Sequence, residues 1–270
     1  TGASGHLGTA LVSSYIEKGY DSSGLVLLGN SEKRSDTLRR KFGTEVLTGD
    51  ISNVNFLRRI FDTNSISKII HCAAIKYVSI ANDNPTRTVE INILASHTLY
   101  NLAIEHGIRD VISISTDKAI NPSNTYGMTK KLMEEMAIEY GFCVVSGVNF
   151  FGSTGSVLDV WYEQLSSSKD LSITNMDCVR YFVKTEEMVD IILDSFGQNK
   201  IIYCKHVYRV IMSDLLAAFK DVFDYYSHIV TGLLPGEKLE EELPYGIKII
   251  NSTKNDLIDM IKLWKKDRFE

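Results

Sequence analysis

Three glycines with a regular spacing open the chain, at Gly2, Gly5 and Gly8, and they lead into the amphipathic segment 9–16. Glycine lets the backbone turn tightly at such positions, and it lets a phosphate approach the amide groups at the start of a helix. An apolar run typical of a strand, Leu25–Leu28, comes next. A glycine loop that opens a helix and is followed by a strand indicates a phosphate-binding βαβ unit.

Strand and helix signals then alternate as far as residue 148. Strand signals fall at 45–48, 68–74, 111–114 and 142–148, and helix signals at 55–62, 85–106 and 126–140. This alternation predicts an α/β fold, a doubly wound parallel sheet of the Rossmann type, with a dinucleotide-binding domain over residues 1–149. Shorter elements follow, so we expect residues 150–270 to form a smaller, irregular substrate-binding part.

The first strand of such a sheet is missing from this sequence. A Rossmann sheet carries a central apolar strand directly before its glycine loop, whereas this sequence starts at Thr1. Without that strand, the two neighbouring strands would lose backbone hydrogen-bond partners. A chain that starts at Thr1 is therefore expected to fold poorly.

Composition narrows the class of protein. A chain of 270 residues, 44% of them hydrophobic, can bury a substantial core, and its net charge of −5 argues against non-specific binding of nucleic acid. No apolar stretch is long enough to span a bilayer, and no signal-peptide pattern appears. The four cysteines and six histidines lack metal-ligand spacing, so reduced thiols and no metal site are expected. We expect a cytoplasmic homo-oligomer that binds neither nucleic acid nor membrane.

A polar motif, Ser115–Lys118, ends the buried strand signal at Val111–Ile114. This places Thr116, Asp117 and Lys118 at the carboxyl end of a strand, which is where ligands bind in an open α/β sheet. The alternative for Asp117 and Lys118 is an exposed ion pair after a strand.

Tyr126 and Lys130 are one helical turn apart at the start of the predicted helix 126–140, so their side chains share a face. A lysine there favours the tyrosinate and is expected to bring the phenol, with a reference pKa of about 10, towards the operating pH of a general base. The alternative is a surface tyrosine and lysine that share a helix face by chance. The glycine loop and the Thr116–Lys118 triplet favour the catalytic interpretation.

These motifs together resemble the extended short-chain dehydrogenases/reductases. Within that superfamily, the chain is similar to the inverting UDP-N-acetylglucosamine 4,6-dehydratases of surface-polysaccharide and nonulosonic-acid pathways. The segments that carry the resemblance, besides the glycine loop and Tyr126 with Lys130, are 49–51, 73–76, 88–92, 115–119, 121–122, 155–157, 179–182 and 235–239. Thr116–Lys118 is the most discriminating of them. Retaining dehydratases typically carry Thr-Asp-Glu there, and 4-epimerases generally lack the Asp-Lys pair.

The resemblance implies roles for the five candidate catalytic residues. Tyr126 would take the proton of the sugar's C-4 hydroxyl while hydride leaves C-4, with Lys130 holding the cofactor ribose and the tyrosinate charge. Lys118, as a neutral amine, would remove the C-5 proton, and Asp117, as a protonated carboxyl, would donate to the departing C-6 hydroxyl. Thr116 belongs to the same catalytic triplet. Hydride would return to C-6, and reprotonation at C-5 would occur on the opposite face.

The resemblance also implies binding residues. The cofactor would be NADP, with NAD possible, and its expected contacts besides Tyr126 and Lys130 are Gly2, Ser4, Gly5, His6, Leu7, Gly8, Asn30, Asp50, Ile51, Ala73, Ala74 and Lys76. The substrate, a UDP-sugar, would contact Lys76, Asn149, Ser156, Arg180 and Glu237. Asp50 could equally be a helix N-terminal acid and Arg180 a surface arginine. For Asn92, a packing or backbone-bridging role is expected.

Several positions depart from the family pattern. The segment Gly29–Ser31 stands where the family usually shows Ser-Arg-Asp, whose arginine suits a 2′-phosphate. Thr154 and Leu234 stand where arginines are common, and Glu240 where a histidine is common. The resemblance therefore implies a UDP-N-acetylhexosamine 4,6-dehydratase that inverts C-5, most simply acting on UDP-N-acetylglucosamine. The alternatives are a UDP-sugar 4-epimerase or reductase, or a non-catalytic cofactor-binding relative.

Overall fold

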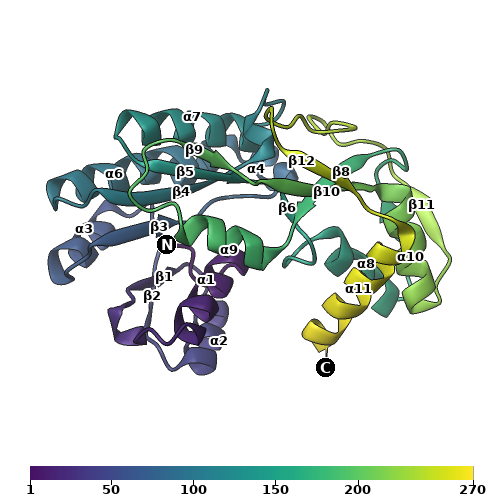
Figure 1. The fold of residues 1–270 in the computed structure, drawn as a ribbon, viewed down its shortest axis with the longest axis horizontal. Coiled ribbons are helices and arrows are strands. Elements are labelled where there is room, and N and C mark those ends of the chain that lie inside the picture. The colour runs from purple at the N-terminus through teal and green to yellow at the C-terminus, as the bar shows by residue number, and fades with distance from the viewer. Residues whose placement is uncertain (270) are drawn as a thin grey trace. The chain divides into compact units, whose positions relative to one another are not determined.

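A computed structural model describes residues 1–269 of the chain, which form two compact units (Figure 1). The first unit contains Thr1–Gly147 together with Thr185–Tyr203, and the second contains Val148–Lys184 and the residues from Cys204 onward. The sequence-based boundary at residues 149 and 150 did not anticipate the return of 185–203 to the first unit. That segment belongs there because its strand, Ile201–Tyr203, pairs with the strand Cys143–Gly147.

The first unit has the Rossmann-like α/β fold predicted from the sequence. Its main sheet has four parallel strands in the order β3 (Lys68–His71), β4 (Asp110–Thr116), β5 (Cys143–Gly147) and β9 (Ile201–Tyr203). A second parallel pair consists of β1 (Leu27–Gly29) and β2 (Val46–Thr48). Because all these strands are parallel, their carboxyl ends share one edge of the sheet.

Helices cover both faces of the main sheet. Figure 1 shows α6 and α7 on one face and α9 on the other. The helices of this unit are α1 (His6–Glu17), α2 (Glu32–Phe42), α3 (Val54–Thr63), α4 (Val78–Asp83), α5 (Pro85–Val89), α6 (Ala95–Glu105), α7 (Thr125–Glu139) and α9 (Thr185–Leu193). The helix predicted over 85–106 is interrupted by one wider π-helical turn, Glu90–Leu94. Leu99, Leu102, Val111 and Val144 lie in the core between α6 and the sheet.

Residues Thr1–Ala3 lie between the strand pair and the main sheet. The amide of Ala3 donates to the carbonyl of Leu28 in β1, at 2.9 Å. On the other side, the amino group of Thr1 donates to the carbonyl of Ile70 in β3, at 2.7 Å, and the amide of Cys72 donates to the carbonyl of Thr1, at 3.1 Å. In the described part of the chain, these residues rather than a strand connect β1 with β3 through backbone hydrogen bonds.

The second unit is a smaller mixed α/β body. Its four-stranded sheet has the order β12 (Lys248–Asn251), β10 (His206–Ile211), β8 (Val179–Val183) and β6 (Asn149–Phe150), with β10 and β8 antiparallel. A parallel pair consists of β7 (Leu171–Ile173) and β11 (His228–Val230). The helices α8 (Val157–Ser166), α10 (Met212–Phe223) and α11 (Lys254–Phe269) enclose a core that contains Trp161, Phe219 and Leu257.

Candidate active site

The glycine loop packs too tightly for any larger residue. A Cβ atom added to Gly8 would lie 2.3 Å from the carbonyl oxygen of Gly2, and one added to Gly2 would lie 2.7 Å from the amide nitrogen of Ala73. Gly2 also has a φ of +71°, in the left-handed region that favours glycine. Helix α1 starts directly after the loop, and its N-cap, Gly5, supplies no side-chain hydrogen bond. The first amides of α1 therefore meet no side-chain cap, as a phosphate-binding helix N-terminus requires.

We expect Gly8→Ala to destabilise the protein by about 1–3 kcal/mol, the usual range for overpacking a closely packed site. The added methyl group would overlap the backbone of Gly2 and Ala3, which cannot move without displacing the loop. The free energy of unfolding, from denaturant titration, measures the effect. Gly24→Ala is the matched control, because its Cβ would meet only the Tyr15 hydroxyl, at 3.3 Å. Equal stability of the two variants would contradict this account.

The other predicted loop residues differ in exposure. Ser4 and Leu7 are buried, so the side chain of Leu7 contributes to packing, and only its backbone amide suits the predicted contact. His6 is the first residue of α1, and its Nε2 lies 2.8 Å from Oγ1 of Thr185, the first residue of α9. This hydrogen bond links the glycine loop to the segment that returns to the first unit.

Asn30 and Asp50 follow β1 and β2, and both have partners within the chain. Arg34 donates to Oδ1 of Asn30 at 3.4 Å. Asp50 accepts from the amide and hydroxyl of Ser52 and forms an ion pair with Arg87. Burial acts to raise the pKa of the Asp50 carboxyl, but the hydrogen bonds from Ser52 and Arg87 outweigh it and hold the pKa below its ordinary value.

Ala73, Ala74 and Lys76 lie after β3, where Asn92 fixes the backbone. Oδ1 of Asn92 accepts from the amide of Ile75 at 2.8 Å, and its Nδ2 donates to the carbonyl of Ile75 at 3.1 Å. The same Nδ2 donates to Oγ1 of Thr129 in α7, at 3.0 Å. The backbone-bridging role predicted for Asn92 is confirmed. Lys76 is exposed, with its ammonium 5.2 Å from the ring centre of Tyr77. Ile51, after β2, is buried.

The Thr116–Lys118 triplet lies at the carboxyl end of β4, as predicted. Asp117 is buried, and its Oδ1 accepts from Oγ1 of Thr116 at 2.8 Å and from Nζ of Lys118 at 3.0 Å. Its second oxygen, Oδ2, is also buried and has no hydrogen-bond partner among the described residues. A buried carboxylate oxygen without a donor is costly, so Oδ2 is the atom of this group that a hydroxyl of a ligand would satisfy.

Helix α7 is held directly against this triplet. Asn124 caps the helix through a 2.9 Å hydrogen bond from the amide of Gly127. A Cβ added to Gly127 would lie 2.1 Å from the carbonyl oxygen of Lys118, so only glycine allows this approach. The first turn of α7, which carries Tyr126, therefore lies on the backbone of Lys118.

The electrostatic environment of Tyr126 and Lys130 differs from the sequence-based expectation. Burial raises the pKa of the Tyr126 phenol, a hydrogen bond with Thr116 lowers it, and the charge of Asp117 raises it. The net direction is upward, so the prediction that the phenol pKa falls towards the operating pH is wrong for this structure, because burial dominates. Burial also lowers the pKa of the Lys130 ammonium to about 8, although Glu134 and Cys72 act to raise it.

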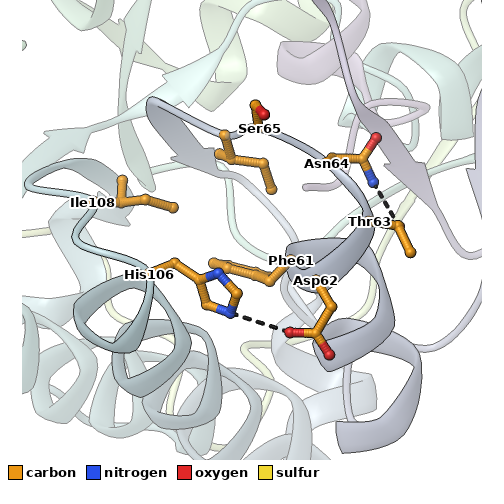
Figure 2. A pocket seen from close by; sticks show the side chains of 8 residues that line it. Phe61, Asp62, Thr63, Asn64, Ser65, His106 and Ile108 are labelled. Atoms are coloured by element: carbon orange, nitrogen blue, oxygen red, sulfur yellow. Dashed lines mark hydrogen bonds and ion pairs between the residues drawn. The ribbon is translucent and has the colours of Figure 1, made fainter.

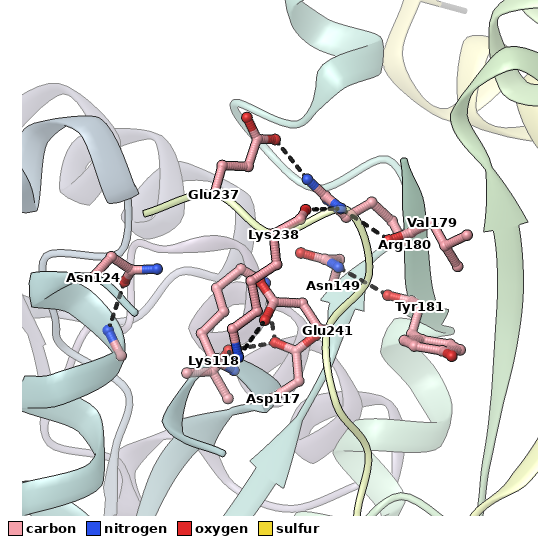
Figure 3. Close-up of polar contacts among 12 residues, drawn as sticks. Asp117, Lys118, Asn124, Asn149, Val179, Arg180, Tyr181, Glu237, Lys238 and Glu241 are labelled. Atoms are coloured by element: carbon pink, nitrogen blue, oxygen red, sulfur yellow. Dashed lines mark hydrogen bonds and ion pairs between the residues drawn. The ribbon is translucent and has the colours of Figure 1, made fainter. Parts of the chain in front are cut away.

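Four predicted substrate residues belong to the second unit. Arg180 in β8 forms an ion pair with Glu237, N–O 2.5 Å, and donates to the carbonyl of Lys238 (Figure 3). Asn149 donates to the carbonyl of Tyr181 at 2.9 Å. Ser156 is the N-cap of α8, and its buried hydroxyl has no partner in the described part of the chain. The structure thus pairs two residues that were predicted separately, Arg180 and Glu237.

Two residues that lie near predicted site residues were not among the sequence-based candidates. Glu134 is buried one turn after Lys130 in α7, and that spacing could have identified it. Arg87 in α5 pairs with Asp50, and nothing local in the sequence indicates that contact. Glu240, at a departure from the family pattern, accepts from the Tyr181 hydroxyl and from Nε of Arg209.

One cavity of the first unit is lined by none of these residues. It has a volume of about 360 Å³ and is lined by the end of α3 and by His106 and Ile108 (Figure 2). His106 lies 3.3 Å from the Asp62 carboxylate there. These residues precede β3 and β4, so the cavity lies at the edge opposite the Thr116–Lys118 triplet. Residues 1–269 include no cluster of three or more metal-ligating side chains and no helix apolar and long enough to cross a bilayer.

Comparison with known proteins identifies the family. The model of the family described as "Polysaccharide biosynthesis protein" matches residues 1–262. The chain is 28% identical over 258 residues to a UDP-glucose 4-epimerase of Rickettsia massiliae, covering 90% of this chain and 76% of that one. Among solved structures, Pen from Bacillus thuringiensis superposes with a TM-score of 0.88 at 21% identity, covering 98% and 96% of the two chains. DesIV, a dTDP-glucose 4,6-dehydratase of Streptomyces venezuelae solved with NAD and TYD, gives 0.84 at 17% identity, covering 99% and 96%. The chain belongs to the polysaccharide biosynthesis protein family and has the Rossmann-like fold of these epimerase and dehydratase structures.

Proposed function

We propose that this protein is a nucleotide-sugar 4,6-dehydratase that uses a nicotinamide dinucleotide and inverts C-5 of a UDP-N-acetylhexosamine. The observation that carries the proposal is the ion pair of buried Asp117 with partly buried Lys118 at the end of β4, in contact with the helix that bears Tyr126. Oxidation at C-4 needs only Tyr126 and a hydride acceptor. Loss of water needs a further base and a further acid, and Lys118 and Asp117 are groups of those two kinds.

A dinucleotide fits the residues of the first unit. The glycine loop leaves no room for side chains, and the uncapped amides of α1 suit a pyrophosphate. We propose that Gly2, Gly5 and Gly8 let the pyrophosphate approach and that Lys130 holds the nicotinamide ribose. The bound nicotinamide supplies a hydride acceptor that later returns the hydride. The proposed cofactor is NADP, with NAD as the alternative, and NAD is the dinucleotide bound in DesIV of Streptomyces venezuelae.

The proposed reaction assigns one proton to each catalytic group. Tyr126 takes the proton of the C-4 hydroxyl as hydride leaves C-4, which gives a 4-keto sugar. The keto group makes the C-5 proton acidic, and Lys118 removes it. Asp117 donates a proton through its carboxyl group to the C-6 hydroxyl, which leaves as water. Hydride then returns to C-6, and a proton adds to C-5 on the opposite face, so the product is a 6-deoxy-4-keto sugar with inverted C-5.

In the second unit, Arg180 is the proposed partner of the UDP pyrophosphate, because charge-assisted contacts to phosphate are strong. Its present partner is Glu237, and a pyrophosphate would compete with that carboxylate. Ser156 and Asn149 would be further contacts, since the Ser156 hydroxyl has no partner among the described residues. Thr154 and Leu234 stand where family members commonly carry arginines. We therefore propose that Arg180 is the main cation that binds the phosphates.

The second candidate function is a UDP-sugar 4-epimerase. The name of the Rickettsia relative favours it, and an epimerase needs the same oxidation at C-4. It does not need an acid and a base for C-6 and C-5, and the Asp117–Lys118 pair therefore favours the dehydratase. Incubation of the protein with UDP-N-acetylglucosamine, followed by mass spectrometry, tests the choice. A dehydratase gives a product lighter by one water, whereas an epimerase gives a product of unchanged mass.

Arg34 is the residue expected to decide between the two dinucleotides. It lies in the first turn of α2, after β1, and contacts Asn30, where a 2′-phosphate would be recognised. The carboxylate of Glu32 in the same turn repels a 2′-phosphate, so the difference in affinity between NADP and NAD is expected to be modest. We expect NADP to bind more tightly than NAD. We also expect Arg34→Ala to weaken NADP binding about tenfold, or about 1.4 kcal/mol, while the affinity for NAD stays unchanged.

The measurement is the dissociation constant of each dinucleotide, by fluorescence titration. Arg40→Ala is the matched control, because Arg40 lies at the far end of α2 in an exposed ion pair with Asp36. A dissociation constant for NAD at least about tenfold lower than that for NADP in the unaltered protein would refute the preference.

A further inference from the structure

His71 is a buried histidine at the end of β3, with only 2% of its surface exposed. Both of its ring nitrogens have partners. Nδ1 lies 2.7 Å from Oγ1 of Thr1, the residue directly before Gly2, and Nε2 lies 2.9 Å from Oγ of Ser96 in α6. Tyr100, also in α6, packs edge-on against the ring, with the ring centres 6.5 Å apart. The imidazole therefore bridges the start of the glycine loop and helix α6.

The hydrogen bonds around the His71 ring determine which nitrogen carries the hydrogen. The hydroxyl of Ser96 donates its single hydrogen to the carbonyl of Asn92, at 2.9 Å, so it accepts from Nε2 of His71. At the other end of the ring, Oγ1 of Thr1 accepts from the amide of Ala73 at 3.4 Å, and its own hydrogen is left for Nδ1. Both ends require the same state, a neutral imidazole with its hydrogen on Nε2.

The surroundings of the ring favour this neutral state. Burial lowers the pKa of the His71 imidazole well below its ordinary value, and the positive charges of the Thr1 amino group and of Lys130 on α7 act in the same direction. A second proton, on Nδ1, would also displace the hydrogen that the Thr1 hydroxyl donates there. The hydrogen-bonded chain is therefore complete only while the ring is neutral.

The same chain of hydrogen bonds continues from Ser96 to the helix that bears Tyr126. Asn92 lies in the π-helical turn, and its Nδ2 donates to Oγ1 of Thr129 at 3.0 Å. The hydroxyl of Thr129 donates in turn to the carbonyl of Tyr126, at 2.9 Å. Ser96, Asn92 and Thr129 are all buried, and a buried polar network with every member paired is rigid. His71 thus connects the glycine loop with the network that holds the turn of Tyr126.

We propose that His71 is a positioning residue for dinucleotide binding: as a neutral ring with its hydrogen on Nε2, it holds Thr1, and with it the glycine loop, against α6. Gly2 follows directly and lies against the backbone of Ala73, so a displacement of Thr1 reaches the loop at once. A loop whose geometry is fixed in advance loses less freedom when it binds a pyrophosphate. The inference rests on the proposed binding of a dinucleotide and is independent of whether the sugar reaction is a dehydration or an epimerisation.

The tautomer is tested by NMR of the ring nitrogens, in unliganded protein labelled with ¹⁵N at histidine and assigned with His71→Gln. The His71 ring should show a protonated Nε2 and an unprotonated Nδ1. It should also remain neutral at a pH of about 6.5, the ordinary midpoint of a histidine. A ring that carries its hydrogen on Nδ1, or one that is half charged at that pH, would overturn the proposal.

The positioning role is tested by the dissociation constant of NADP, from fluorescence titration. Thr1→Val removes the hydroxyl that donates to Nδ1 but keeps the shape of the side chain. It should weaken NADP binding at least about fivefold, or about 1 kcal/mol, because a buried acceptor loses its donor. Thr1→Ser keeps the hydroxyl and should bind NADP as tightly as the unaltered protein does. His97→Gln, at the exposed histidine next to Ser96, is the matched control and should also leave the affinity unchanged.

Equal NADP affinity of folded Thr1→Val and the unaltered protein would show that the hydrogen bond serves folding alone, and the positioning role would be wrong. If Thr1→Val fails to fold, Ser96→Ala takes its place, because it removes the acceptor at the other end of the ring. It should weaken NADP binding in the same way, and an unchanged affinity would overturn the proposal equally. An unaltered protein that binds neither NADP nor NAD would refute the proposed function and the positioning role together, whereas failure of the inference alone leaves dinucleotide binding intact.

Discussion

Replacing Lys118 with alanine is expected to stop dehydration while oxidation at C-4 continues. In the proposed reaction, Lys118 acts only after the 4-keto group has formed, whereas Tyr126 and Lys130, which serve the first step, lie on a separate element. General base catalysis contributes about 10²–10⁴-fold, so the rate of water loss should fall by at least about 10²-fold. Single-turnover absorbance of the reduced nicotinamide and mass spectrometry of the sugar measure the two steps separately.

Lys131→Ala is the matched control for this variant, because its side chain is exposed and pairs with Glu135 on the outer face of α7. It should retain both steps. If Lys118→Ala also loses the reduced nicotinamide and the 4-keto sugar, Lys118 is needed for oxidation or folding, and the role given to it as the C-5 base is wrong.

Tyr126→Phe is expected to abolish both steps, because no base then receives the proton of the C-4 hydroxyl. The expected loss is again about 10²–10⁴-fold, and it should appear already in the formation of reduced nicotinamide. Burial raises the pKa of the Tyr126 phenol, so the tyrosinate fraction of the unaltered protein grows with pH. The rate of oxidation should therefore rise with pH until Lys130, with a pKa of about 8, loses its proton.

Tyr140→Phe is the control, since Tyr140 lies at the end of the same helix and its hydroxyl donates to Asn101 at 2.6 Å. It should leave the formation of reduced nicotinamide unchanged. If Tyr126→Phe still oxidises C-4 at the original rate, another residue must be the base.

Local features of the site could be predicted from the sequence because they depend on residues close in the chain. Backbone contact at Gly8 allows no side chain, and helical periodicity places Tyr126 and Lys130 on one face. Alternation of strand and helix signals likewise located β4 and α7 to within a residue or two. Each of these inferences follows from spacing alone.

Pairings between distant segments could not be predicted in this way. Arg180 and Glu237 are separated by 57 positions, and neither residue type indicates that the two bind each other. The same holds for Asp50 with Arg87 and for the segment 185–203, whose return to the first unit depends on the pairing of β9 with β5. The predicted direction of the Tyr126 pKa shift was wrong because the sequence shows that a charged residue is one helical turn from the phenol, but it does not show how deeply the phenol is buried.

The measurement that tests the central claim most directly is the NMR spectrum of the product formed from UDP-N-acetylglucosamine in deuterated water. A dehydratase with Lys118 as the C-5 base should give a 6-deoxy-4-keto sugar with inverted C-5 and with deuterium at C-5, because the proton removed there exchanges with solvent. A product that retains its C-6 hydroxyl and its C-5 proton and differs only in the configuration at C-4 would contradict the account and identify an epimerase.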